Sequence, residues 1–230
     1  MKDSKKSSSY SDEWYTPKFI IDSLGKFDLD PCAPSVPLFK TAEVMYNEFD
    51  DGLAQKWEGR VWLNPPYSRP LINKFMRRIS EHNRGTALIF SRTDTELFHA
   101  EVFNKATAVK FLKGRIKFLR PDGSDAGTPG CGSVLIAYGE EDANILECNE
   151  LKGEIYKVMK TIRVDGRTYA AVEVDENVAC KGCIFYTVGW DMNTPRCTAA
   201  NIPEFQCVSV VGDEEKNVIF KLMANNVTEE

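Results

Sequence analysis

The sequence lacks the features that mark several classes of protein. It has no apolar run near the roughly 18 residues that a membrane span needs, and its start, MKDSKKSSSYSDEW, is too polar for a signal peptide. Its 2 histidines, His82 and His99, have no second histidine or cysteine in register. We therefore expect a cytosolic protein, with a disordered tail at residues 1–11 and no membrane partner.

A strong positive charge is also missing. The net charge is −5 and the pI about 5.3, so a nucleic acid would have to meet a local basic surface. The segment KFLKGRIKFLR is such a candidate, although a solvated pair of strands would also account for it. The basic residues of this segment and of a second cluster are Lys110, Lys113, Arg115, Lys117 and Arg120, and Arg77, Arg78 and Arg84.

Apolar runs and helical patterns alternate over the first two thirds of the chain. The pattern predicts an α/β fold with a mostly parallel sheet that carries helices on both faces. Thr16 is the expected N-cap of the first helix, with Pro17 at its first position and Gly25 after its end. The expected helices are 17–24, 69–84 and 94–106, and the expected strands are 26–30, 42–51, 61–63, 86–90, 108–112, 115–119 and 133–139, with a long turn region at 121–132.

The character of the sequence changes near residue 149. Segment 152–174 is typical of a β-hairpin with Asp165 and Gly166 as its turn, and four cysteines follow. The sequence thus predicts a main domain at 12–148 and a small, β-rich, cysteine-containing C-terminal domain at 149–230.

The four cysteines are Cys180, Cys183, Cys197 and Cys207. The first pair has the C-x2-C spacing that lets two thiolates bind one tetrahedral zinc, whereas the second pair is spaced more widely than usual. One structural zinc and free, packed thiols both remain open, and disulfides are a distant third in a reducing cytosol.

Unusual residues follow two of the expected strands. Asp30-Pro31-Cys32-Ala33 ends one, and Asn64-Pro65-Pro66-Tyr67 ends another. Ligands of open α/β sheets bind beyond the carboxyl ends of strands, so both segments are candidate site residues. Taken alone, the second segment could also be a plain connection in which Tyr67 fills a gap and Asn64 caps a turn.

Five motifs occur in a fixed order: DEWYTP at 12–17, LDPCAP at 29–34, NPPYS at 64–68, RTDT at 92–95 and GRIKF at 114–118. In this the chain resembles the phage-type Dam family of adenine-N6 DNA methyltransferases, over roughly residues 10–140. The resemblance implies a Rossmann-like, S-adenosylmethionine-dependent methyltransferase fold. It also implies methyl transfer from S-adenosylmethionine to the N6 amine of adenine in double-stranded DNA.

The resemblance implies roles for individual residues as well. The oxygen of Asn64 and the carbonyl of Pro65 would accept the hydrogens of the amine, Pro66 would stiffen the loop, and Tyr67 would stack on an extruded base. The expected cofactor-binding residues are Trp14, Thr16, Pro17, Asp30, Pro31, Cys32 and Ala33, although DPCAP has no glycine-rich fingerprint.

Several further assignments have plain alternatives. Asp50 or Asp51 is expected to hold ribose hydroxyls, unless both belong to a solvated acidic turn. Arg92 and Asp94 are expected to line the target pocket and bind DNA, unless they cap the following helix. Lys113, Arg115 and Lys117 are expected to follow the phosphates of DNA, with Arg115 matching the motif.

Other functions stay open at this point. The same loop would suit adenine in RNA or a glutamine amide in a protein, and a non-catalytic DNA-binding module would have the same fold. Intact Asn64 and Tyr67 speak against the last hypothesis, because a module without activity would tolerate their loss.

Overall fold

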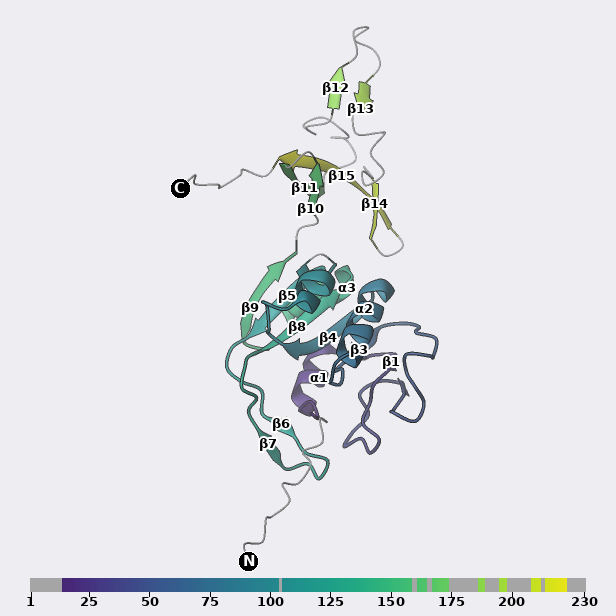
Figure 1. Cartoon of the computed structure of the whole chain (residues 1–230), viewed down its shortest axis with the longest axis vertical. Coiled ribbons are helices and arrows are strands. Elements are labelled where there is room, and N and C mark those ends of the chain that lie inside the picture. Colours follow the sequence, from purple (N-terminus) through teal and green to yellow (C-terminus); the bar gives the residue numbers. More distant parts are fainter. Residues whose placement is uncertain are drawn as a thin grey trace, which may run out of the picture. The chain divides into compact units, whose positions relative to one another are not determined.

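The computed structural model describes residues 14–103 and 105–158, and the backbone of strands 161–164, 167–173, 186–188, 195–197, 208–211 and 214–222. The chain divides into two compact units, Met1–Tyr156 and Lys157–Glu230, each described by itself below (Figure 1). The sequence placed the division earlier, at 148/149. Strand β9, Gly153–Lys157, is part of the sheet of the first unit, which moves the end of that unit downstream.

A seven-stranded sheet forms the centre of the first unit. Its first four strands are parallel to one another, and β5 runs in the same direction because both β4 and β5 are antiparallel to β8. The predicted α/β architecture with a mainly parallel sheet is therefore confirmed. The order of the strands is β2 (Val44–Met45), β1 (Leu29–Asp30), β3 (Val61–Leu63), β4 (Gly85–Phe90), β8 (Ser133–Tyr138), β5 (Ala108–Leu112) and β9.

Strand β8 runs against its two neighbours, which the sequence did not predict. All six of its residues are buried, as are all six of β4. A central strand that is covered on both faces is an apolar run whatever its direction, so the residue pattern carries no information on direction.

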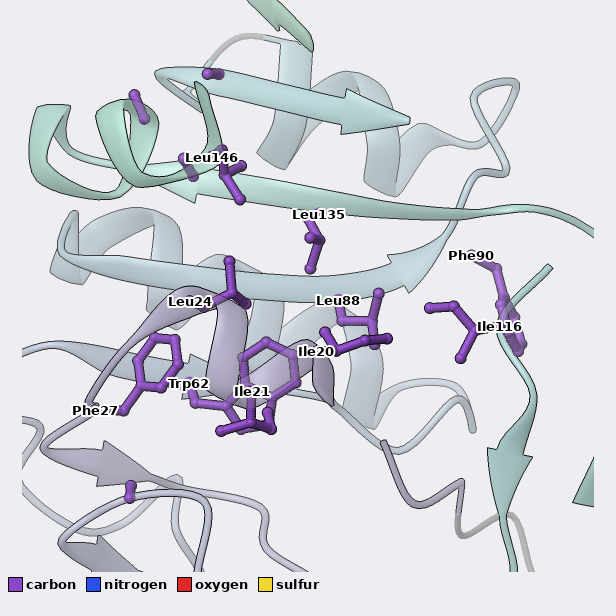
Figure 2. Packing of buried hydrophobic residues seen from close by; sticks show 14 of the residues in the cluster. Ile20, Ile21, Leu24, Phe27, Trp62, Leu88, Phe90, Ile116, Leu135 and Leu146 are labelled. Carbon is purple, nitrogen blue, oxygen red and sulfur yellow. The ribbon is translucent and has the colours of Figure 1, made fainter. Parts of the chain in front are cut away.

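The helices cover both faces of this sheet. Helix α1, Lys18–Leu24, and helix α3, Glu140–Cys148, contribute Ile20, Leu24 and Leu146 to one buried cluster, where they meet Trp62 and Leu88 of the strands (Figure 2). Helix α2, Leu71–His82, packs on β3 and β4 and contacts the π-helix η1, Phe98–Phe103. The buried residues of α2 and η1 are absent from that cluster, so these two helices cover the opposite face.

Three expected elements differ in detail. Helix α1 begins at Lys18 with Pro17 as its N-cap, and no side chain caps it, so the expected cap by Thr16 is wrong. The expected strand 115–119 is only β6, Phe118–Leu119, which forms a separate ribbon with β7, Asp125–Gly127. Ile116 and Phe118 are buried while Arg115 and Lys117 are exposed, which explains why basic and apolar residues alternate in this segment.

Helix α3 was not predicted, because its charged start hides a buried contact. Asp142 is fully buried and accepts hydrogen bonds from Arg60, at 2.8 and 3.0 Å, and from Thr86, at 2.6 Å. Arg60 also donates to the carbonyls of Leu24 and Lys26, at 2.8 and 2.9 Å. This network joins α1, β3, β4 and α3 at the edge where β3 begins, opposite the edge of its carboxyl end.

The second unit consists of strands in the residues described. β10, Thr161–Val164, and β11, Arg167–Glu173, form an antiparallel hairpin in which Val164 pairs with Arg167, as the sequence predicted. β14, Val208–Val211, and β15, Glu214–Leu222, complete a four-stranded sheet, and β12, Tyr186–Val188, pairs with β13, Pro195–Cys197. Among the described residues of the whole chain, no helix has the length and hydropathy of a membrane span.

Candidate functional site

A pocket of about 320 Å³ opens at the carboxyl ends of β1 and β3. Strand β1 pairs with β2 on one side and with β3 on the other, so the chain leaves β1 in one direction and then crosses back over it. Such a switch point leaves a crevice between the two connections. The pocket brings together most of the predicted site residues, namely Trp14, Thr16, Asp30, Pro31, Cys32, Ala33, Asp51, Asn64, Pro65, Pro66 and Tyr67.

Asn64 lies at the centre of this arrangement. Its amide nitrogen donates to the carbonyl of Trp14, at 2.6 Å, and to the hydroxyl of Thr16, at 3.2 Å. Its oxygen Oδ1 is buried and has no hydrogen-bond partner within the part of the chain that the structure describes. A buried acceptor without a partner is costly, so this oxygen is suited to accept a hydrogen from a ligand.

Tyr67 forms an aromatic wall of the pocket. Its ring stacks on Phe90 at the end of β4, with centroids 4.0 Å apart and an angle of 18° between the planes. Trp14 meets Phe90 and Phe118 edge-on, at 6.2 and 5.5 Å. Burial raises the pKa of Tyr67 far above its ordinary value, so the hydroxyl stays protonated. One ring face of Tyr67 is covered by Phe90, and Tyr67 also lines the pocket.

The end of β1 is bonded internally. Asp30 accepts a hydrogen bond from the hydroxyl of Thr41, at 2.5 Å, and another from the backbone N–H of Cys32, at 3.1 Å. Burial raises the pKa of Asp30 to about 6, although both hydrogen bonds act to lower it. The thiol of Cys32 donates to the backbone carbonyl of Asn64, at 3.2 Å. Asp30 and Cys32 thus fix the turn after β1 against the loop after β3.

The loop after β2 supplies the acidic part of the pocket. Asp51 lines it, whereas Asp50 accepts the N–H of Asn47, at 3.0 Å, and is not a lining residue. Glu48, which the sequence analysis missed, also lines the pocket, and its carboxylate accepts the hydroxyl of Ser35, at 3.0 Å. Glu48 follows the end of β2 more closely in sequence than either aspartate does. This position is the sequence feature that could have identified it as a pocket residue.

A close approach fixes the same loop. A Cβ atom on Gly52 would lie 1.8 Å from the carbonyl oxygen of Pro31. Only glycine therefore fits where this loop packs against the turn after β1.

The remaining predicted residues lie outside the pocket lining. Pro17 precedes α1, and Arg92 and Asp94 are exposed in the turn after β4, where Arg92 lies 5.8 Å from the Phe90 ring. Lys113 is exposed, and Lys117 pairs with Asp125 at 3.5 Å. These exposed positions are compatible with a contact to a larger partner, and the expected DNA contact stays a prediction.

Arg115 is exposed beside these lysines, and one of its guanidinium nitrogens donates to the carbonyl of Pro129. That bond uses only part of a side chain with five N–H donors. The described residues form no ion pair with Arg115, so its remaining donors can bind an anionic partner.

The side chains of the predicted zinc ligands lie outside the part of the chain that the structure describes. Cys180, Cys183 and Cys207 lie outside the described residues, and only the backbone of Cys197 is described, opposite Tyr186 in the β12–β13 pair. Residues 14–103 and 105–158 contain no cluster of three or more metal-binding side chains. The zinc site stays a prediction.

Fold and pocket together define an α/β protein with a pocket at a switch point. Its lining includes an aromatic wall and an asparagine whose amide oxygen has no hydrogen-bond partner among the described residues. A sequence model of the family described as Dam, DNA N-6-adenine-methyltransferase, matches residues 3–151. The chain therefore belongs to the Dam family, as the five motifs suggested. All the predicted catalytic and cofactor-binding residues lie inside the matched range.

Two relatives carry the name DNA N-6-adenine-methyltransferase. The protein of Haemophilus phage HP1 is 32% identical over 165 residues, which is 63% of this chain and 91% of the relative. The protein of Escherichia phage T1 is 30% identical over 111 residues, and there the match spans only 44% of this chain and 45% of the relative. No solved structure matches this chain.

Proposed function

We propose that the protein transfers a methyl group from S-adenosylmethionine to the N6 amine of adenine in DNA. Membership of the Dam family and the names of the two phage relatives support this proposal. The observation that carries it is the buried Oδ1 of Asn64, which has no hydrogen-bond partner in the described part of the chain. An exocyclic amine has two hydrogens to donate, and an acceptor oxygen fixed in a pocket is what such a group requires.

The residues present fit S-adenosylmethionine. Glu48 and Asp51 offer carboxylates for ribose hydroxyls, and Trp14 and Ala33 offer apolar walls within one pocket of about 320 Å³. The strand order, with a reversed β8 between β4 and β5, is compatible with the Rossmann-like methyltransferase fold that the family implies. When bound, the cofactor supplies a methyl group on a positively charged sulfur.

The protein's own residues orient the amine. Asn64 Oδ1 accepts one N6 hydrogen and the carbonyl of Pro65 accepts the other, which frees the nitrogen lone pair from the ring and directs it toward the methyl donor. An adenine inside a duplex cannot reach this pocket, so the base leaves the stack and lies against Tyr67. The stack of Tyr67 on Phe90 holds the ring in place before the base arrives.

The decisive experiment is to incubate the protein with labelled S-adenosylmethionine and unmethylated duplex DNA, and then to digest the DNA to nucleosides. Label in N6-methyladenosine is the expected result. RNA and total protein are offered in parallel reactions, because label found only there would replace DNA adenine with RNA adenine or a protein glutamine. Absence of label in all three would refute the proposed enzyme activity.

The contact with DNA is tested at Arg115. We expect Arg115→Ala to weaken DNA binding and to reduce the slope of log affinity against log salt by about one, because one phosphate contact is lost. The control is Arg84→Ala. Arg84 precedes β4 at the opposite edge of the sheet and pairs with Glu141, at 3.2 Å. Equal slopes for the Arg115 variant and the wild type would place the DNA track elsewhere.

A further inference from the structure

The segment from Trp14 to Thr16 contacts the proposed catalytic asparagine directly. Nδ2 of Asn64 has two hydrogens, and it has two acceptors, the Trp14 carbonyl at 2.6 Å and the Thr16 hydroxyl at 3.2 Å. The nitrogen side of the amide is therefore fully used. Its oxygen has no hydrogen-bond partner among the described residues, and Asn64 lines the pocket.

The Trp14 carbonyl determines which way the amide faces. A carbonyl oxygen only accepts, so turning the amide by half a revolution would place two acceptors against each other. The turned amide would also present N–H donors to an amine that itself donates. Only the observed orientation offers an acceptor to the substrate, and any rotation of the amide would remove it.

The segment itself is held from two sides. Tyr15 and Leu119 of β6 exchange a pair of backbone hydrogen bonds, at 3.3 and 3.0 Å, and the Tyr15 hydroxyl donates to the carbonyl of Val36, at 3.2 Å. The Trp14 ring packs edge-on against Phe118, at 5.5 Å. The two acceptors of the Asn64 amide thus have fixed positions.

The Thr16 hydroxyl has no capping role in this arrangement. Helix α1 has Pro17 as its N-cap and receives no side-chain cap bond. Thr16 is only 6% exposed, and Asn64 is the hydrogen-bond partner that its hydroxyl has in the structure. This differs from the helix cap that the sequence suggested. Thr16 also lines the pocket, so its expected contact with the cofactor stays a prediction.

We propose that Thr16, together with the backbone carbonyl of Trp14, is a positioning residue that keeps the acceptor oxygen of Asn64 turned into the pocket. The inference rests on the proposed methyl transfer and adds to it a residue that acts on the reaction through Asn64. It predicts an effect on turnover without an effect on the binding of either substrate.

The test is Thr16→Val, which keeps the shape of the side chain and removes the hydroxyl. We expect kcat to fall about tenfold, as the loss of one orienting hydrogen bond implies. The KM for DNA and the Kd for S-adenosylmethionine, measured by calorimetry, stay unchanged. Thr16→Ser restores the hydroxyl and returns kcat to within about twofold of the wild type. Thr107→Val is the matched control, because Thr107 lies before β5 at the opposite edge of the sheet.

A second measurement does not depend on activity. In ¹⁵N-labelled protein the side-chain amide signal of Asn64, assigned by its loss in Asn64→Ala, should exchange slowly with solvent in the wild type and in Thr16→Ser. In Thr16→Val it should shift and exchange faster. This readout applies even if the wild type transfers no methyl group, which would refute the proposed function alone.

Three outcomes would overturn the inference. In an active enzyme, an unchanged kcat for Thr16→Val would show that the hydroxyl does not orient Asn64. A weaker Kd for S-adenosylmethionine with kcat retained would make Thr16 a contact of the cofactor. A fast-exchanging Asn64 amide in the wild type would contradict the inference without any kinetic data.

Discussion

The carboxyl ends of β1 and β3 lie next to each other in one sheet, yet their polar groups are bonded differently. After β1, both carboxylate oxygens of Asp30 have hydrogen-bond donors within the protein, Thr41 and Cys32. After β3, Asn64 Oδ1 and the hydroxyl of Tyr67 are buried and have no partner among the described residues. The carboxylate at the end of β1 thus has its hydrogen bonds within the protein, whereas the polar groups after β3 can form hydrogen bonds with a ligand.

This difference indicates that the two strand ends have different roles. A satisfied carboxylate fixes its own turn, whereas each unsatisfied buried group costs about 1–3 kcal/mol of stability. Two such groups on residues that line one pocket are the pattern expected where a ligand completes the hydrogen bonding. We infer that the end of β1 supports the site and the end of β3 carries out the proposed chemistry.

The largest effect is expected for Asn64→Ala, which removes the open acceptor. Methyl transfer should fall by about 10²–10³ in kcat, the usual cost of losing one preorganised group that acts on the reacting atoms. The Kd for S-adenosylmethionine should barely change, since the proposed role of this acceptor is to bind the amine of the substrate. Rapid-quench assays and calorimetry provide the two numbers.

A matched control makes this result specific. Asn73→Ala is the same chemical change on the exposed part of α2 and should leave turnover unaltered. If Asn64→Ala turned over normally, Asn64 would be only a structural cap, and the contrast between the two strand ends would lose its meaning.

Tyr67 allows its ring and its hydroxyl to be tested separately. Tyr67→Ala removes the surface that we propose for the extruded base and should weaken DNA binding by about 1–3 kcal/mol, the usual value of one base stack. Tyr67→Phe keeps the stack on Phe90 and loses only a hydroxyl that is buried without a partner among the described residues. It should therefore bind DNA almost normally and melt no earlier than the wild type. A large loss in Tyr67→Phe would instead mean that the hydroxyl bonds the substrate.

A substitution of Asp30 tests the end of β1, where both carboxylate oxygens have hydrogen-bond donors within the protein. Burial raises its pKa to about 6, so the folded protein binds a proton more tightly than the unfolded chain does. Stability supported by that proton is present at low pH and is lost as the pH rises through this pKa. Asp30→Asn has no titrating group at this position. When the pH rises from about 4 to 7, its free energy of unfolding should therefore increase by on the order of 2 kcal/mol relative to that of the wild type.

Urea unfolding of both proteins at the two pH values measures this change. The absolute stability of Asp30→Asn is not the readout, because the amide also alters the hydrogen bonds with Thr41 and Cys32. Parallel pH profiles for the two proteins would show that Asp30 has an ordinary pKa, and hence that the end of β1 is more open to solvent than the structure indicates.

The sequence alone predicted the elements that depend on local pattern. Apolar runs located β3, β4, β5 and β8, and helical spacing located α2. The segment Asn64–Tyr67 was identified because two prolines directly after a buried strand are unusual. The direction of β8 was missed, because the residues of a strand buried on both faces do not depend on its direction. Helix α3 was missed because Asp142 pairs with Arg60 from a distant part of the chain.

The details of the site also depended on contacts between distant residues. Thr16 stands where a helix cap is expected, and only the folded chain brings Asn64 to its hydroxyl, 48 residues away in sequence. Likewise, Glu48, Asp50 and Asp51 form one acidic stretch, and which of them line the pocket depends on how Gly52 packs against Pro31. No local pattern contains that information.

The smallest effect is expected at Cys32, which links the two strand ends. Its thiol donates to the backbone carbonyl of Asn64, at 3.2 Å. A thiol is a weak donor, so Cys32→Ala should cost less than about 1 kcal/mol of stability, and Cys32→Ser should keep the hydrogen bond between the two strand ends.

Burial, and next the charge of Asp30, raise the pKa of the Cys32 thiol well above its ordinary value. Iodoacetamide should therefore modify the exposed Cys148 well before Cys32, as mass spectrometry of peptides can measure. Rapid modification of Cys32 would show that the contact between the two strand ends opens in solution, and that the loop after β3 is not held by the turn after β1.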